Sequence, residues 1–110
     1  MRVRKSILEM KAAPSMRLLA MAGPAARRSN IGIYNCSYQP VDSIDSFVEA
    51  LLISMNGCGV GFSVESKYVE SLPRIKRQVG GEPKYVLVED TTEGWANALL
   101  LGLEHWFNGF

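Results

Sequence analysis

Two segments of the chain carry apolar side chains at helical spacing. The first follows Asp42 and Ser43, either of which suits a helix N-cap, and it runs to Gly57, a residue type that commonly ends helices. The second follows Asp90 and Glu93, which fit a capping box with Asp in place of Ser or Thr. The two apolar faces comprise Ile44, Phe47, Val48, Leu51, Leu52 and Met55, and Trp95, Ala98, Leu99, Leu103 and Trp106. The pattern therefore predicts two amphipathic helices.

Three segments are predicted as strands. Residues 31–39 contain β-favouring side chains and end at Pro40. Val60, Phe62 and Val64 alternate with other residues, as one face of a strand does. Residues 85–88 form a short apolar run that is typical of a buried strand.

The remaining segments are short. A helix is predicted over residues 3–12, ended by Pro14, and the apolar run 18–22 stops at Gly23-Pro24. Residues 27–30 read as a polar loop, 66–72 as a helical turn closed by Pro73, and 74–83 as a flexible loop. The order of helices and strands favours α/β or α+β packing in a single domain over residues 1–110.

Composition excludes several classes of protein. The chain has 110 residues, is 47% hydrophobic and 21% charged, and carries a net charge of +1. This balance predicts a globular chain without the electrostatic footprint of a nucleic-acid or membrane-surface partner. The apolar stretch 96–103 is far shorter than a membrane span, and two cysteines make no disulfide framework. We therefore expect a cytoplasmic protein.

Cys36 lies inside the first predicted strand, and its residue type leaves two interpretations open. One is a small buried core residue, and the other is a redox or nucleophilic thiol, which needs a partner group. The spacing does not bring His105, the one histidine, close to it. Cys58 is a possible disulfide partner, but sequence cannot decide the geometry. The cysteines and the histidine lack the spacing of a zinc site, so no metal is predicted.

The stretch Gly57-x-Gly59-x-Gly61 precedes a predicted strand. Dinucleotide and P-loop glycine motifs instead follow a strand and open a helix, so neither is matched. A tight turn, or a close backbone approach to a neighbouring strand or a ligand, is what the glycines indicate.

Several motifs together resemble the adenosylcobalamin-dependent (class II) ribonucleotide reductases, in the order of that family. They are Ala13-Pro14-Ser15-Met16-Arg17, Ala22-Gly23-Pro24-Ala25, Tyr34-Asn35-Cys36-Ser37-Tyr38 followed by Pro40-Val41-Asp42, Gly59-Val60-Gly61-Phe62-Ser63-Val64-Glu65, and Val88-Glu89-Asp90 followed by Glu93-Gly94-Trp95. The resemblance covers the chain from about Ile7 onward. It implies an α/β fold, namely the opening strands and helices of a ten-stranded barrel.

The resemblance also implies a reaction and site residues. The reaction converts a ribonucleoside di- or triphosphate to its deoxy form by a thiyl-radical mechanism, with adenosylcobalamin as cofactor. Cys36 matches the first cysteine of the reducing pair, Asn35 and Cys36 match positions lining the substrate site, and Gly59 matches a glycine whose backbone approaches the substrate. Residues 42–44 (Asp42, Ser43 and Ile44) match the start of an effector-specificity site. The implied partners are the ribonucleotide, a nucleotide effector, a thioredoxin-type reductant and the remainder of the reductase.

The chain departs from the family in three respects. The radical cysteine of the family lies in an Asn-x-Cys-x-Glu pattern, which does not occur in this sequence. The cobalamin-binding elements and the second reducing cysteine are not matched either. We therefore expect a reductase fragment that is inactive without its remainder. The alternative is a non-catalytic remnant or partner-binding module that keeps the fold.

Overall fold

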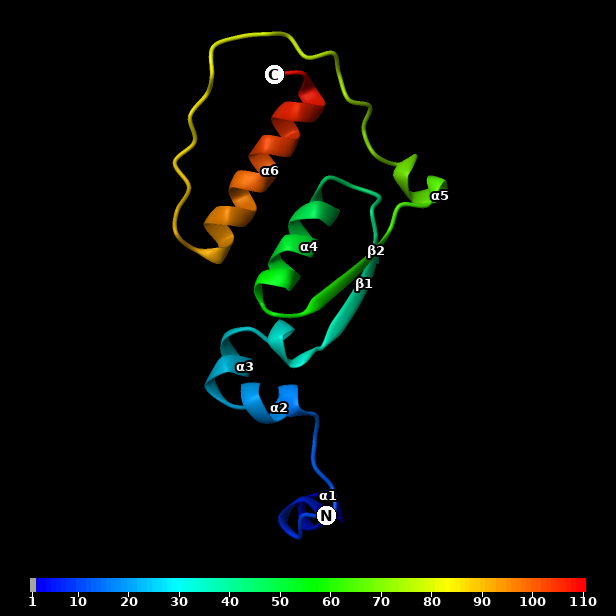
Figure 1. The fold of residues 1–110 in the computed structure, drawn as a ribbon, viewed down its shortest axis with the longest axis vertical. Helices are drawn as coiled ribbons and strands as arrows, with labels where there is room; N and C mark the ends of the chain where they lie inside the picture. Colours follow the sequence, from blue (N-terminus) through cyan, green and yellow to red (C-terminus); the bar gives the residue numbers. More distant parts are fainter. Residues whose placement is uncertain (1) are drawn as a thin grey trace. The chain divides into compact units, whose positions relative to one another are not determined.

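The structure is a computed structural model that describes residues 2–110 (Figure 1). The chain divides after Asn35 into two compact units, a first unit that ends at this residue and a second unit of residues 36–110. The boundary falls just before the first strand. Each unit is described by itself below.

The first unit consists of short helices. These are α1 (Arg2–Leu8), α2 (Met16–Met21), α3 (Pro24–Arg28) and the 3-10 turn η1 (Ile31–Ile33). Ser15 caps α2, because its side chain accepts a hydrogen bond from the backbone N–H of Leu18. Pro24 stands at the first turn of α3, where its missing N–H costs nothing.

Two expectations for this region are wrong. Arg27 and Arg28 belong to α3 and not to a polar loop, since Pro24 starts a new helix instead of only ending the previous segment. Residues 31–33 form a helical turn, so the strand predicted over 31–39 begins only at Cys36. The β-favouring Ile33 and Tyr34 were overridden by the turn hydrogen bond from the N–H of Tyr34 to the carbonyl of Ile31.

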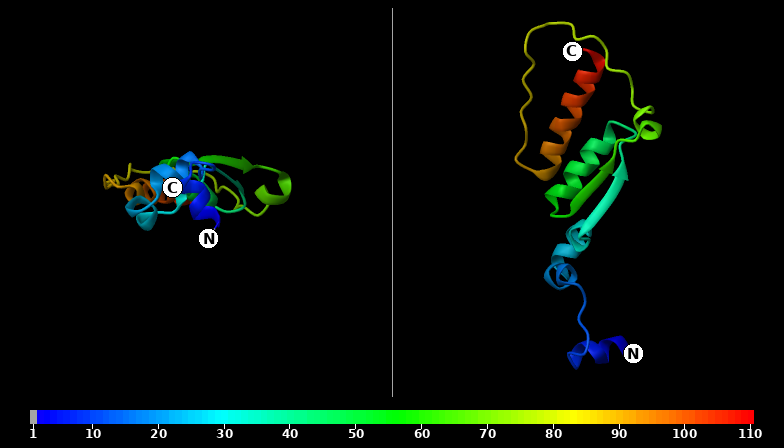
Figure 2. Two further views of the ribbon diagram at one scale, coloured as in Figure 1. Left: turned by 90° about the horizontal axis from the view of Figure 1, so that it is seen from below. Right: turned by 45° about the vertical axis from the view of Figure 1, so that its right-hand side comes forward.

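The second unit is built on a strand–helix–strand arrangement. It comprises β1 (Cys36–Pro40), α4 (Asp45–Met55) and β2 (Gly59–Ser63). The two strands are parallel and pair in register from Cys36 with Gly59 to Pro40 with Ser63. A parallel pair needs a crossover connection, which α4 supplies, and the helix packs beside the strands (Figures 1 and 2). The predicted strand, helix and second strand are confirmed in this order.

The start of α4 differs from the prediction, whereas its end agrees. Neither Asp42 nor Ser43 is the N-cap, which is Ile44 without a side-chain hydrogen bond. Asp42 instead accepts a hydrogen bond from the Ser46 hydroxyl at 3.1 Å, so its carboxylate is held by α4 and does not cap it. Gly57 lies just beyond the helix with a φ of 79°, the left-handed conformation that favours glycine.

The unit continues through α5 (Ser66–Val69) to α6 (Thr92–Asn108), which packs against α4. The short α5 confirms the predicted helical turn. The predicted capping box of α6 is wrong by one residue, because the Thr91 hydroxyl accepts the hydrogen bond from the backbone N–H of Gly94 at 2.9 Å. The buried side of α6 is centred on Ala96, while Trp95 and Trp106 are more than half exposed.

Residues 73–91 contain no helix or strand, and they include the predicted loop 74–83. The buried strand predicted over 85–88 is wrong, because Tyr85 is 94% and Leu87 is 96% exposed and neither pairs with a strand. The segment passes the C-terminal end of α6 and returns along that helix to its start (Figures 1 and 2).

The core of the described chain is thin. Its buried apolar residues are Val41, Cys58 and Ala96, and no side chain of residues 2–110 is below 2% exposed. Parallel sheets are normally covered on both faces, and a two-stranded sheet is marginal alone. The second unit therefore has the layout of a βαβ element that leaves one face of its sheet open. Within the described part of the chain, no helix is long and apolar enough to cross a membrane.

Candidate functional site

The predicted substrate-site residues Cys36 and Gly59 lie side by side at the amino ends of the two strands. They are the first residues of β1 and β2 and face each other in the parallel register. The Ser37 hydroxyl donates a hydrogen bond to the carbonyl of Gly59 at 3.2 Å, which ties the strands together at this level. The strand register thus brings together two residues that are 23 positions apart in the sequence.

The two faces of the sheet differ in cover. Gln39 donates from its side-chain amide to the carbonyl of Ser46 in α4, so Gln39 and its register partner Phe62 lie on the helix side. Side chains alternate between faces along a strand, and register partners share a face. Cys36, Tyr38, Gly59 and Gly61 therefore lie on the opposite, open face. We call these four residues the open-face site.

The residues of the open-face site are exposed, and two of them are in contact. Cys36 is exposed, and the Tyr38 side chain is 65% exposed. The Tyr38 ring lies beside Gly61, since a Cβ placed on that glycine would sit 3.5 Å from the Tyr38 Cδ2 atom. The open-face site thus presents a thiol and a phenol ring two residues apart, about 7 Å along one strand, next to bare backbone. Tyr38 was missed from the sequence as a site residue, although its i, i+2 spacing from Cys36 would have revealed it.

Cys58 has a different environment from Cys36. It is 3% exposed, and its thiol contacts the carbonyl of Gly59 at 3.6 Å. Both cysteines are free. A disulfide between the two is therefore not formed, and the question that the sequence left open is answered in favour of two separate thiols.

The other predicted site residues lie elsewhere. Asn35 precedes Cys36 in the chain and is the last residue of the first unit. Asp42, Ser43 and Ile44 follow the carboxyl end of β1, six to eight residues beyond Cys36 in the printed sequence, which is about 20 Å or more for extended chain. The Ser46 hydroxyl, only 5% exposed as a residue, bonds to Asp42 and Ser43. The predicted effector segment and the open-face site are thus at opposite ends of the strand.

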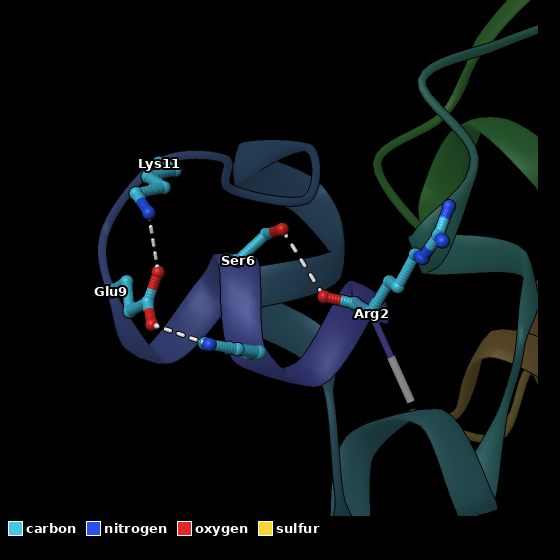
Figure 3. Close-up of polar contacts among 5 residues, drawn as sticks. Arg2, Ser6, Glu9 and Lys11 are labelled. Carbon is cyan, nitrogen blue, oxygen red and sulfur yellow. Dashed lines mark hydrogen bonds and ion pairs between the residues drawn. The ribbon is translucent and has the colours of Figure 1, made fainter.

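Charged groups near the sheet are few. Glu65 and Lys67 pair at 2.9 Å at the start of α5, and the Lys67 ammonium lies over the Tyr68 ring. The hydrogen bond that the Lys67 ammonium donates to Glu65, followed by its hydrogen bond with Tyr68, raises the pKa of Lys67 above its ordinary value of 10.5. The first unit carries a separate set of ion pairs, in which Glu9 meets Lys5 at 3.7 Å and Lys11 at 2.6 Å, while Ser6 bonds to the carbonyl of Arg2 (Figure 3). These pairs are exposed, so they contribute little to stability and form no site.

Two further features bear on metal and cofactor binding, namely the grouping of metal-ligating side chains and the cavities of the second unit. No three His, Cys, Asp or Glu side chains of residues 2–110 are grouped to hold a metal ion. One cavity of the second unit, of about 420 Å³, lies between the sheet, α4 and α5 and is lined by apolar residues such as Phe47, Phe62 and Leu72. Another, of about 1000 Å³, lies between residues 79–86 and α6. Neither cavity is lined by Cys36.

Comparison with known proteins adds no relative. No family model, no curated protein and no solved structure matches the chain. What is known of the site therefore comes from the residues and their geometry.

Proposed function

We propose that this chain is part of the catalytic domain of an adenosylcobalamin-dependent ribonucleotide reductase, in which Cys36 supplies one thiol of the reducing pair. One observation carries the proposal. Cys36 and Gly59, which the family motifs mark as substrate-site residues, pair directly across two parallel strands and share an open face. The ordered motifs and this pairing support each other, because the motifs depend on the order of residues in the chain and the pairing depends on the strand register.

The chemistry that Cys36 would perform is a two-electron reduction. Two thiols become one disulfide, and their two electrons and two protons convert a ribonucleotide into a deoxyribonucleotide and water. Cys36 is suited to one half of this step, because it is exposed and stands on a strand, and rigid elements position reacting groups well. The second thiol must come from another segment, since Cys58 is only 3% exposed whereas Cys36 is exposed.

The unpaired edges of the sheet support the proposal that this chain is part of a larger domain. Each strand has one unpaired edge within the described chain, and within the second unit the helix that packs on the sheet is α4. Further strands and a covering layer are what a complete α/β domain would add. The radical cysteine, the second reducing cysteine and the cofactor site belong to that remainder in this proposal.

The proposal is tested by complementation. The chain is mixed with the remaining part of a class II reductase barrel, adenosylcobalamin and a dithiol, and deoxyribonucleotide is measured by chromatography. We expect turnover with the natural chain. Cys36→Ser should abolish multiple turnover, and the matched control Cys58→Ser should retain it in a complex of the same mass.

Two results would overturn the proposal. One is a folded complex of the natural chain without any turnover, and the other is equal turnover with Cys36→Ser. The first result would favour the second candidate function, a partner-binding module. The observation behind that candidate is the apolar side chains left exposed beside the sheet, with Phe62 63% and Val64 64% exposed.

A further inference from the structure

Residues 80–90 form an extended segment that is tied to α6 at both of its ends, and we call it the strap. Before it, Lys76 and Val79 donate backbone hydrogen bonds to the carbonyls of Phe107 and Gly109 at the end of α6, both at 3.0 Å. After it, Thr91 caps the start of α6. The strap therefore begins and ends at fixed points on one helix.

The strap has the side chains of a strand but lacks the pairing. Residues 85–88 are Tyr-Val-Leu-Val, a run with high β-propensity. Yet residues 80–88 make no backbone–backbone hydrogen bond within the described chain. Because Tyr85 and Leu87 are almost fully exposed, these backbone groups face solvent as a free strand edge does.

The chain's own sheet is out of reach of the strap. In all the views of Figures 1 and 2 that show α6 from the side, this helix lies between the strap and α4, and the sheet lies beyond α4. The 17 residues of α6 span about 25 Å, and the strap is fastened at both ends of that length. It could pair with β1 or β2 only by releasing these ends. The free edge is therefore available to another molecule.

Charge makes the strap complementary to itself. Lys84 precedes the apolar run and Glu89 follows it, and both are exposed. When two straps run antiparallel about the midpoint between Val86 and Leu87, each Lys84 stands opposite Glu89 of the other copy. The same register places Tyr85 opposite Val88, and aromatic with β-branched pairs stabilise antiparallel strands. Pro83, which has no N–H, ends the pairing beyond Lys84.

We propose that the strap is a dimerisation element, through which two copies of this chain join by antiparallel pairing of residues 84–89. The interface is two-fold symmetric, so that each copy uses the same residues. The Lys84–Glu89 contacts set the register, and the apolar run provides the buried area. This inference is independent of the proposed reductase function.

Sedimentation equilibrium of the whole chain tests it. We expect a concentration-dependent rise from the 12.2 kDa of one chain to twice that mass and no further. Lys84→Glu and Glu89→Lys each place like charges opposite each other twice in the dimer, so each should weaken dimerisation by roughly tenfold or more. The double variant Lys84→Glu/Glu89→Lys restores both pairs and should recover the natural dissociation constant. Glu70→Lys, an exposed charge reversal outside the strap, is the matched control and should have no effect.

Three outcomes would overturn the proposal. They are a chain that stays monomeric up to millimolar concentration, open-ended assemblies in place of a closed dimer, and single variants whose weakening is not rescued by the double reversal. Circular dichroism of each variant shows whether the helices are intact. The double variant keeps the test valid without this control. If a single variant failed to dimerise because it was misfolded, a second charge reversal would not restore its dissociation constant.

Discussion

Gly109 should be the least replaceable glycine at the C-terminal end of α6. Its φ is 82° and its ψ is 30°, so it adopts the left-handed conformation that ends helices. Its backbone N–H bonds to the carbonyls of His105 and Trp106, and its own carbonyl accepts the N–H of Val79. Gly109→Ala perturbs both the conformation and the contact with the segment before the strap.

The magnitude follows from two costs. A residue with a Cβ pays about 1 kcal/mol to adopt the left-handed conformation. The Cβ would also sit 2.6 Å from the carbonyl oxygen of Arg77 and 3.2 Å from the Lys76 Cβ, so the backbone of residues 76–79 must move. Moving it breaks the two backbone hydrogen bonds that this segment donates, each worth about 0.5–1.5 kcal/mol. The expected loss is about 2–4 kcal/mol of the free energy of unfolding.

Urea unfolding followed by tryptophan fluorescence measures this loss, because Trp95 and Trp106 both lie on α6. Gly102→Ala is the matched control on the same helix. A Cβ there would meet nothing within 4 Å, so the control should stabilise by about 0.5–1 kcal/mol through helix propensity. Amide hydrogen exchange at Lys76 and Val79 gives a local readout, and both amides should lose protection in Gly109→Ala alone.

Equal stability of the two variants would refute the reasoning, and so would unchanged exchange at Lys76 and Val79 in Gly109→Ala. Either result would mean that residues 76–79 do not pack on the end of α6. The strap would then lose one of its two fixed ends, and the argument that it cannot reach its own sheet would fail with it.

Two further predictions follow from the cysteines and from the helix cap. Cys36 should react with a disulfide reagent such as Ellman's reagent at the rate of an exposed thiol. Cys58 should react at least about tenfold more slowly until urea is added. Equal rates for the two thiols would contradict the difference in their burial. Thr91→Ala should lower the free energy of unfolding by about 1 kcal/mol and Asp90→Ala by much less, as measured by urea unfolding. A larger loss for Asp90→Ala would mean that Asp90 is the N-cap, as the sequence predicted.

Local patterns predicted the elements of the second unit well where the side chains have one period and clear ends. The helix before Gly57 and the strand at Val60 are examples, because Gly57 takes the left-handed conformation that ends a helix and the residues from Val60 alternate as in a strand. Caps were predicted less well. Asp42 and Asp90 are good capping residues, but Ser46 binds the first, and Thr91 stands one position closer to α6 than the second. Which of several neighbouring polar side chains makes the capping hydrogen bond depends on their positions in three dimensions, and the sequence does not give these.

The strand predicted over 85–88 shows a different limit. Its residues favour a strand, but a strand needs a partner, and α6 separates this segment from the only sheet of the described chain. Propensity describes what a segment is suited to, and pairing depends on what lies beside it. The candidate site shows the opposite case, in which a contact exists in the structure without a signal in the sequence. No pattern in the sequence alone places Cys36 next to Gly59, because that contact is made by the register of two strands separated by a helix.

The open face and the chemistry proposed for Cys36 are linked by the need to exclude water. A thiol that takes part in radical reduction must be shielded, since open solvent admits side reactions. In the described chain Cys36 is exposed, and the residues nearest to it on the same face of the sheet are Tyr38, Gly59 and Gly61. In the reductase proposal, the layer that covers this face therefore also closes the site. If the reductase proposal holds, folding of the complete domain and assembly of the active site are one event. The active site then forms only when the domain folds completely.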